Sequence, residues 1–291
     1  MIHSIQSGTL YIDIDDQGAE LKSLYSKKTN TEYLWQGNAA IWERQAPVLF
    51  PIVGRLKNNQ YTYGDKTYEM PPHGFVFDAP FSAEVIGENG IAFIYEDTKE
   101  TRAIYPFSFT LQVIFVVNWN KLEVVYQVIN RTNGPMYFSF GSHEGYCCPR
   151  ADGEAFSDYY LEFDHDADYT SLTVSPDGLL IKEPIQITQN ERRLPLSYDL
   201  FDDSSLVFAD IPSGKVVLGS TKTPAKIEIN YESAPNLVVW SQTDAPYVCK
   251  EPWHGLPDFE DASGDLTKKP GIIQIEKGGT YNWRHTITVY E

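Results

Sequence analysis

Residues 136–149 read Met136-Tyr-Phe-Ser-Phe-Gly-Ser-His-Glu-Gly-Tyr-Cys-Cys-Pro149, and they join a short apolar pattern to an ionisable side chain. Met136–Phe140 predicts a buried strand that breaks at Gly141, and His143 is among the first polar residues after the break. A rigid strand that ends beside an imidazole is a common way to position a catalytic acid or base. The competing interpretation is a histidine in an ordinary loop, and the rest of the chain decides between the two.

Short strand patterns recur along the chain. Polar and apolar residues alternate in Tyr11–Asp15 and Leu122–Asn130, Phe109–Val117 is a longer strand pattern, and turn signals return every ~8–12 residues. Helical periodicity is weak, and its best short candidate is Pro195–Phe201. Strand and helix patterns do not alternate, which argues against a doubly wound fold. The sequence predicts an all-β protein, and since it has no linker or composition shift it predicts one domain over residues 1–291.

The composition narrows the class of function. Hydrophobic residues make up 42% and charged residues 22% of the 291 residues, enough for a packed core. The net charge of −17, without any run of basic residues, argues against partners such as nucleic acid or an anionic membrane. No apolar run approaches the ~20 residues that span a bilayer, and the N-terminus lacks a secretory signal pattern. The three cysteines, Cys147, Cys148 and Cys249, do not suggest a disulfide framework, so we expect a cytoplasmic protein.

Two further stretches place ionisable groups among Gly, Pro and aromatic residues. Residues 51–55 read Pro-Ile-Val-Gly-Arg and lead to His73 in Met70-Pro-Pro-His-Gly-Phe75, and Glu251 lies in Tyr247-Val-Cys-Lys-Glu-Pro-Trp-His-Gly-Leu256. An apolar setting would partly desolvate Glu251 and raise its pKa, which suits a general base, while a histidine is a natural acid near neutral pH. The Glu/His pair indicates acid–base chemistry on a polyhydroxylated neutral ligand. Asp258–Pro270, which follows, is interpreted as a long surface loop.

Other chemistries have weaker support. The chain has no Gly-x-Ser-x-Gly elbow, Walker loop or Gly-x-Gly-x-x-Gly fingerprint. Cys148 or Cys249 together with His143 would supply the residue types of a Cys–His dyad, but buried structural cysteines are the simpler interpretation. Asp202-Asp203 with Glu251 would formally supply the carboxylate pair of a glycosidase.

The histidines also allow a metal site in principle. His73, His143 and Glu251 would formally coordinate an ion, but we predict neither a metal nor a cofactor. His254 is close to Glu251 in sequence and either lines the site or is structural. The remaining histidines are interpreted as structural: His3, His165 and His285.

Four blocks in order resemble the aldose 1-epimerase (galactose mutarotase-like) family, with the LacX-like bacterial branch as the nearest match. They are Pro47-Val-Leu-Phe-Pro-Ile-Val-Gly-Arg-Leu56, Pro72-His-Gly-Phe75, Phe138-Ser-Phe-Gly-Ser-His143 and Cys249-Lys-Glu-Pro-Trp253. The resemblance covers the chain from about residue 8 to its end. It implies a large, mostly antiparallel β-sandwich, the supersandwich of this family, with a sugar site on one concave face.

The resemblance also implies roles. His143 corresponds to the general acid at the ring oxygen, and Glu251 to the general base at the C1 hydroxyl. His73 and Arg55 correspond to residues that bind the sugar, and Asp203, with Asp202 next, is matched to an acidic sugar ligand. The implied activity interconverts the α and β anomers of a free aldohexose such as galactose or glucose, in a monomer or homodimer.

The catalytic-histidine block departs from the family at residues 144–148, Glu-Gly-Tyr-Cys-Cys, where Pro-Ala-Phe or similar is expected. The charge of Glu144 would raise the pKa of His143, unless the Glu144 side chain points to solvent.

Two alternative functions stay open. A hexose-6-phosphate mutarotase would need basic groups at the phosphate, with Arg55 and then Arg102 or Lys250 as candidates. The other alternative is a non-catalytic carbohydrate-binding protein on the same fold.

Overall fold

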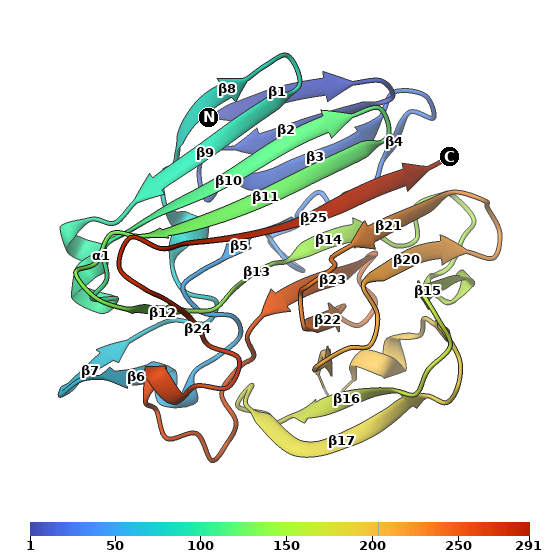
Figure 1. The fold of residues 1–291 in the computed structure, drawn as a ribbon. Coiled ribbons are helices and arrows are strands. Elements are labelled where there is room, and N and C mark those ends of the chain that lie inside the picture. Colours follow the sequence, from blue (N-terminus) through green and yellow to red (C-terminus); the bar gives the residue numbers. More distant parts are fainter. Residues whose placement is uncertain (203) are drawn as a thin grey trace.

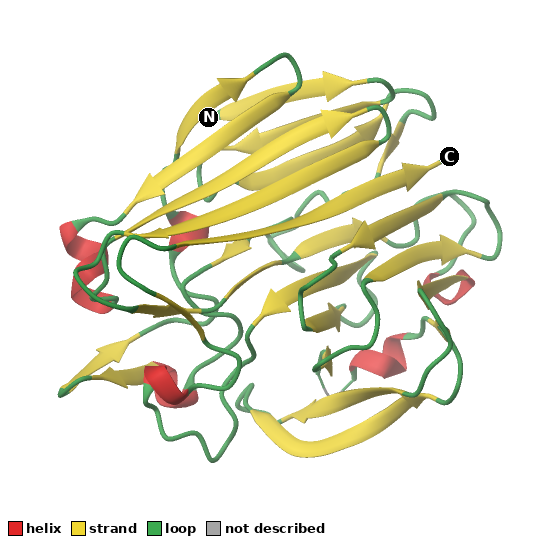
Figure 2. Cartoon of the chain, viewed as in Figure 1, coloured by secondary structure: helices red, strands yellow, loops and turns green. Residues whose placement is uncertain are grey.

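Antiparallel strands form most of the molecule, as the recurring alternation predicts (Figures 1 and 2). The structure is a computed structural model, and it describes residues 1–202 and 204–291. Its largest sheet runs in the order β18 (Arg193–Pro195), β15 (Tyr159–Phe163), β20 (Lys215–Ser220), β21 (Lys226–Asn230), β25 (Thr280–Tyr290), β11 (Lys121–Asn130), β10 (Phe109–Asn118), β9 (Gly90–Glu96) and β8 (Ser82–Ile86).

A second large sheet faces it and carries the residues that the sequence singled out. Its order is β17 (Leu180–Thr188), β16 (Tyr169–Val174), β19 (Leu206–Phe208), β22 (Asn236–Trp240), β23 (Tyr247–His254), β13 (Phe140–Ser142) and β5 (Val48–Leu49), and β14 (Glu144–Cys147) also pairs with β23. A four-stranded sheet holds β1 (Ile2–Ser7), β2 (Leu10–Asp15), β3 (Glu20–Ser26) and β4 (Thr31–Glu32). The remaining strands form two sheets of two strands each: β6 (Gln60–Tyr63) with β7 (Lys66–Glu69), and β12 (Met136–Phe138) with β24 (Ile273–Ile275).

The hydrophobic core lies between these sheets. Side chains of β10 and β11 alternate between buried and half-buried positions, so each strand gives one apolar face to the interior. One continuous apolar cluster includes Ile12, Val113 and Val239, each from a different sheet of the three largest. The predicted fold class, a large mostly antiparallel β-sandwich, is confirmed.

Every residue of β23, a strand of eight residues, is buried. It lies in the middle of its sheet, with β22 on one side and β13 and β14 on the other. Its successive side chains point to opposite faces. One face therefore packs into the core, and the other faces the pocket described below.

The predicted break at Gly141 is wrong. Gly141 lies inside β13, where it pairs with Leu49 and Trp253, and the irregular positions are Ser139 and His143 on either side. The glycine is required by packing, since a Cβ at residue 141 would lie 2.5 Å from Cδ1 of Trp253.

Gly141→Ala is expected to destabilise the fold by about 1–3 kcal/mol, because the methyl group overpacks against the Trp253 indole. Urea unfolding followed by fluorescence measures the loss. Gly134→Ala is the matched control, since nothing lies within 4 Å of the position of its Cβ. Equal stabilities of the two variants would show that β13 accommodates the extra volume.

Helices are few and short among the described residues. Only part of the predicted helix Pro195–Phe201 is helical: the 3₁₀ turn η4 spans Tyr198–Phe201, and Pro195 ends β18. The α-helix α1 (Lys99–Ile104) was not predicted, because it buries no residue and so gives no periodic apolar signal. Thr98 caps it by accepting a hydrogen bond from the Thr101 N–H. The other 3₁₀ turns are η1 (Lys57–Asn59), η2 (Val76–Asp78), η3 (Phe156–Asp158) and η5 (Leu266–Lys268).

Candidate active site

The sheet register brings His143 and Glu251 face to face. Glu144 pairs with Lys250, and Gly141 pairs with Trp253, so the same antiparallel register sets His143 opposite Glu251. Directly opposed residues share one face of a sheet and lie within contact distance. His143 Nε2 lies 3.3 Å from Glu251 Oε2, and both side chains are buried.

A pocket of about 510 Å³ opens over this pair. Its volume is in the range of small-molecule sites. Four of the five predicted site residues line it: Arg55, His73, His143 and Glu251. The rest of the lining is largely aromatic or apolar, with two serines and one further arginine: Trp42, Arg44, Pro47, Leu49, Phe77, Ser204, Ser205, Val238, Trp240 and Trp253.

Burial shifts the pKa values of the opposed pair in opposite directions. It raises the pKa of Glu251 well above its ordinary value, with the charge of Glu144 as a second cause. It lowers the pKa of His143 well below its ordinary value, with His73 as a second cause. Both shifts disfavour a charged side chain in a dry site. Together the two shifts favour the uncharged pair, with the shared proton on Glu251 and a neutral imidazole on His143.

His73 is held by the chain that precedes Arg55. The Gly54 N–H donates to His73 Nδ1 at 3.2 Å, and the His73 backbone N–H donates to the Gly54 carbonyl at 2.8 Å. Burial lowers the pKa of His73 to about 4, and the Arg55 charge acts in the same direction. A neutral imidazole whose Nδ1 accepts a hydrogen bond carries its proton on Nε2. His73 is thus a fixed hydrogen-bond donor, 5.5 Å from His143 between ring centres.

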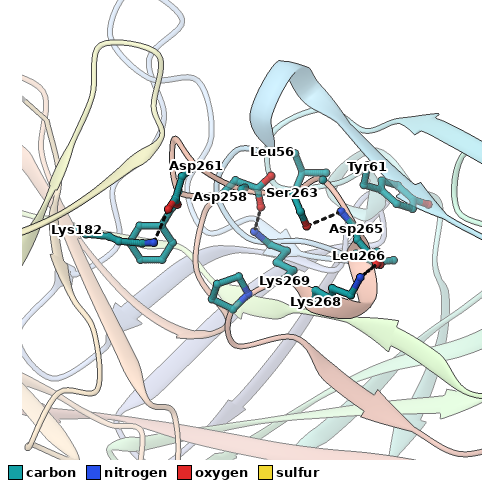
Figure 3. A pocket seen from close by; sticks show the side chains of 14 residues that line it. Leu56, Tyr61, Lys182, Asp258, Asp261, Ser263, Asp265, Leu266, Lys268 and Lys269 are labelled. Carbon is teal, nitrogen blue, oxygen red and sulfur yellow. Dashed lines mark hydrogen bonds and ion pairs between the residues drawn. The ribbon is translucent and has the colours of Figure 1, made fainter.

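A loop after β23, of which Figure 3 labels residues from Asp258 to Lys269, also contacts the segment that carries Arg55. The Asp258 N–H donates to the Arg55 carbonyl at 2.8 Å, and the Lys57 N–H donates to Asp258 Oδ2 at 3.0 Å. Lys269 donates to Asp258 Oδ1 at 2.6 Å in a buried ion pair. The predicted surface loop Asp258–Pro270 is therefore anchored at both ends, and it holds the backbone at Arg55 and at Lys57.

Aromatic rings form one wall of the pocket. The Trp42 ring lies 5.1 Å from the His143 ring at an interplanar angle of 31°, and Trp240 meets Trp42 edge to face. Gly145 permits this approach, since a Cβ there would lie 2.7 Å from Cζ3 of Trp42. Such a wall can stack on the apolar face of a sugar ring while the polar groups opposite bind hydroxyls.

Arg44 is a charged pocket residue that sequence reasoning missed. Its guanidinium lies over the Phe77 ring at 4.4 Å and donates to Asp78 Oδ1 at 2.7 Å. It precedes the Pro47–Leu56 block by only a few residues, but no motif marked it.

Two of the basic groups named as phosphate ligands lie away from the pocket. Arg102 pairs with Asp97 outside it. Lys250 points to the other face of β23, where its Nζ lies 4.4 Å from the Tyr146 ring centre.

The expectations for Glu144 are wrong. Its side chain is buried, neither facing solvent nor raising the pKa of His143, because alternation along the strand turns it to the core face. There Glu144 accepts a hydrogen bond from Ser142 at 2.9 Å, and its Oε1 lies 3.0 Å from His285 Nε2. His254 is structural as well, stacked on Phe140 with its Nδ1 2.9 Å from the Tyr281 hydroxyl.

The predicted acidic ligand Asp203 lies outside the described residues, so its place is not stated. Ser204 and Ser205, which follow it, line the pocket. Asp202, the second choice, is exposed at the end of η4 and is not among the lining residues.

Comparison with known proteins decides the family. Residues 1–287 match the aldose 1-epimerase family. The chain belongs to the aldose 1-epimerase family. Within that family it is 30% identical over 300 residues to the plasmid-encoded protein LacX of Lactococcus lactis subsp. lactis, with 99% of both chains covered.

Two solved structures of proteins from lactobacilli are also similar to this chain. A galactose mutarotase related enzyme from Lactobacillus acidophilus is 35% identical and superposes with a TM-score of 0.95, covering 100% of this chain and 98% of the other. A galactose mutarotase-like protein from Lactobacillus casei is 29% identical with a TM-score of 0.94, and the match covers all of both chains. The resemblance inferred from the four blocks, including its LacX-like branch, is confirmed. Within the described residues no helix has the length and apolar character to cross a membrane.

Proposed function

We propose that the protein is an aldose 1-epimerase, an isomerase that interconverts the α and β anomers of a free aldohexose such as galactose or glucose. The observation that carries the proposal is the buried His143–Glu251 pair in a pocket lined by aromatic and polar side chains. Family membership supports the same reaction class. The expected single-domain organisation, cytoplasmic location and monomeric or dimeric state belong to this proposal and stay predictions.

The proposed reaction needs one proton donated and one accepted. In the form of the pair that carries the shared proton on His143, Glu251 takes the proton of the C1 hydroxyl while His143 protonates the ring oxygen, so that the ring opens to the aldehyde. The step leaves the pair in its uncharged form, with the proton on Glu251. Rotation about the C1–C2 bond presents the other face of the aldehyde, and closure with the roles reversed gives the other anomer. The two reacting oxygens share one carbon, so an acid and a base that lie side by side can reach both. No step requires a metal or a cofactor.

The pocket residues supply binding for this reaction. A sugar that enters would replace the His143–Glu251 contact by hydrogen bonds to its own oxygens. His73 would donate its Nε2 proton near the ring oxygen, and Arg55 would donate to a hydroxyl group. Trp42 and Trp240 would cover the apolar face of the ring.

The test is polarimetry on freshly dissolved α-glucose and α-galactose in phosphate-free buffer. We expect the protein to accelerate relaxation of at least one of them in proportion to its concentration. No acceleration, with sugar binding intact by calorimetry, would leave the non-catalytic carbohydrate-binding alternative. If the protein neither binds the free sugars nor accelerates their relaxation, phosphorylated hexoses are the next substrates to test.

A hexose-6-phosphate mutarotase is the second candidate, and Arg44 is the observation that favours it. Two guanidinium groups, those of Arg44 and Arg55, line the same pocket of an acidic protein. Arginine is well suited to bind phosphate. The ion pair of Arg44 with Asp78 and the net charge of −17 favour a neutral sugar instead.

Arg44→Ala separates the two candidates. For a free hexose we expect KM to stay within about twofold, since Arg44 is engaged by Asp78. A phosphate seated against Arg44 would instead make KM for the hexose 6-phosphate rise about tenfold or more, the effect of losing a charged hydrogen bond of ~1.5–3 kcal/mol. Steady-state mutarotation with both sugars measures the difference, and Arg102→Ala, whose arginine lies outside the pocket, is the control.

A further inference from the structure

Three metal-ligating side chains converge on the pocket side of β23. Cys249 and Glu251 are two residues apart on the strand and so share a face, and His143 lies opposite Glu251. One ligand atom of each lies within 4.8 Å of the others. All three residues are buried, with exposed fractions of 9% for His143, 0% for Cys249 and 1% for Glu251. This set differs from the His73, His143 and Glu251 set that the sequence allowed.

The donor atoms are also available. Within residues 1–202 and 204–291, Glu251 Oε2 is buried and accepts no hydrogen bond, although His143 Nε2 lies 3.3 Å away. In a tetrahedral zinc site with bonds of about 2.0–2.2 Å, the distance between a nitrogen and an oxygen ligand is about 3.3–3.5 Å. The pair therefore already has the spacing of two zinc ligands. The widest separation in the set exceeds such an edge by about 1 Å, so metal binding requires the donor atoms to move closer by about that distance.

We propose that His143, Cys249 and Glu251 form a binding site for Zn²⁺, with the fourth position open to the pocket. A thiolate, an imidazole and a carboxylate are ligands that zinc accepts together, and three protein ligands with one open position is a known zinc arrangement. Thiolate and carboxylate balance the two charges of the ion, so the buried complex is neutral. Binding releases two protons into solvent, the thiol proton of Cys249 and the proton that the His143–Glu251 pair shares, and no oxidation or reduction takes place.

The consequence for the reaction is inhibition, and this part rests on the proposed function. Two of the three ligands are the proposed acid and base, so a bound ion occupies the lone pairs that the proton transfers need. Zinc would thus act as a reversible inhibitor that competes with sugar for the pocket. Metal binding itself requires only the three donors and is measured separately.

Co²⁺ is the probe for the site, because a thiolate bound to Co²⁺ gives a charge-transfer absorption band in the near ultraviolet. After dialysis against a chelator, we expect the wild-type chain to bind one Co²⁺ with this band, and Zn²⁺ to displace it. Cys249→Ser should abolish the band and weaken binding by about tenfold or more. Cys147→Ser and Cys148→Ser are matched controls that keep the band, since those thiols lie outside the three-donor set. Glu251→Gln, which keeps the shape of the side chain, is a second variant that should weaken binding.

Each outcome decides the proposal. Absence of Co²⁺ binding, or a band that is unchanged in folded Cys249→Ser and Glu251→Gln, overturns the site. In the polarimetric assay, Zn²⁺ should slow mutarotation over the concentration range in which it displaces Co²⁺, and a chelator should restore the rate. A band that depends on Cys249 in a protein that does not accelerate mutarotation would keep the metal site and reject the proposed function.

Discussion

Glu251→Gln is expected to lower kcat for mutarotation by about 10² to 10⁴-fold, the usual contribution of a positioned general base. Glutamine has nearly the same shape and keeps a hydrogen-bonding carbonyl, but it cannot accept the proton of the C1 hydroxyl. Because β23 is buried along its length, a change of shape would also disturb the strand, and the isosteric substitution avoids this. Polarimetry over a range of sugar concentrations separates kcat from KM.

The control for Glu251→Gln is Glu260→Gln. Glu260 is an exposed glutamate in the loop after β23, outside the residues that line the pocket, so the same chemical change there should leave the rate at the wild-type value. Calorimetry then measures whether the Glu251→Gln variant still binds the sugar. Wild-type kcat in a folded Glu251→Gln protein would exclude Glu251 as the base and would favour the carbohydrate-binding alternative.

The parts of the fold that the sequence predicted are those with a simple periodic signal. Leu122–Asn130 alternates because β11 has one face in the core, and the alternation is visible without any structure. Helix α1 and the mostly exposed strand β17 give no such signal, since neither presents a regular apolar face. Gly141 misled the prediction because a glycine in a strand can mark either a break or a close packing contact, and only the position of Trp253 shows which applies.

The arrangement of the candidate site could be predicted only in part, because it depends on strand pairing. His143 and Glu251 stand in separate blocks more than a hundred residues apart, and their direct opposition depends on the pairing register of β14 with β23. The register cannot be read from either strand alone. Arg44 escaped notice because an isolated arginine between Glu43 and Gln45 has no distinctive pattern. Glu144 was misjudged because a charged residue beside the proposed acid His143 was assumed to act on it, whereas strand alternation turns the Glu144 side chain to the opposite face.

His143→Asn is expected to lower kcat by about 10² to 10⁴-fold, because the asparagine amide can donate a hydrogen bond to the ring oxygen but cannot transfer a proton to it. The matched change is His73→Asn in the same pocket. His73 is neutral and its Nδ1 accepts the Gly54 N–H, so its proposed role is to donate a hydrogen bond, which an amide can replace. We expect kcat and KM of His73→Asn to change by less than about tenfold, within the worth of one hydrogen bond. Equal losses of kcat in the two variants would reject the assignment of His143 as the acid.

The double variant His143→Asn with Glu251→Gln tests whether the opposed residues act as one unit. If acceptance of a proton by Glu251 and donation of a proton by His143 occur in the same step, the two residues cannot contribute independently, so removing the second should cost little once the first is gone. We expect kcat of the double variant to lie within about tenfold of the slower single variant, far above the product of the two separate losses. Losses that multiply would mean that His143 and Glu251 act in separate steps. Polarimetry with high protein concentrations measures these slow variants against the spontaneous rate, and far-ultraviolet circular dichroism confirms that the sandwich is intact.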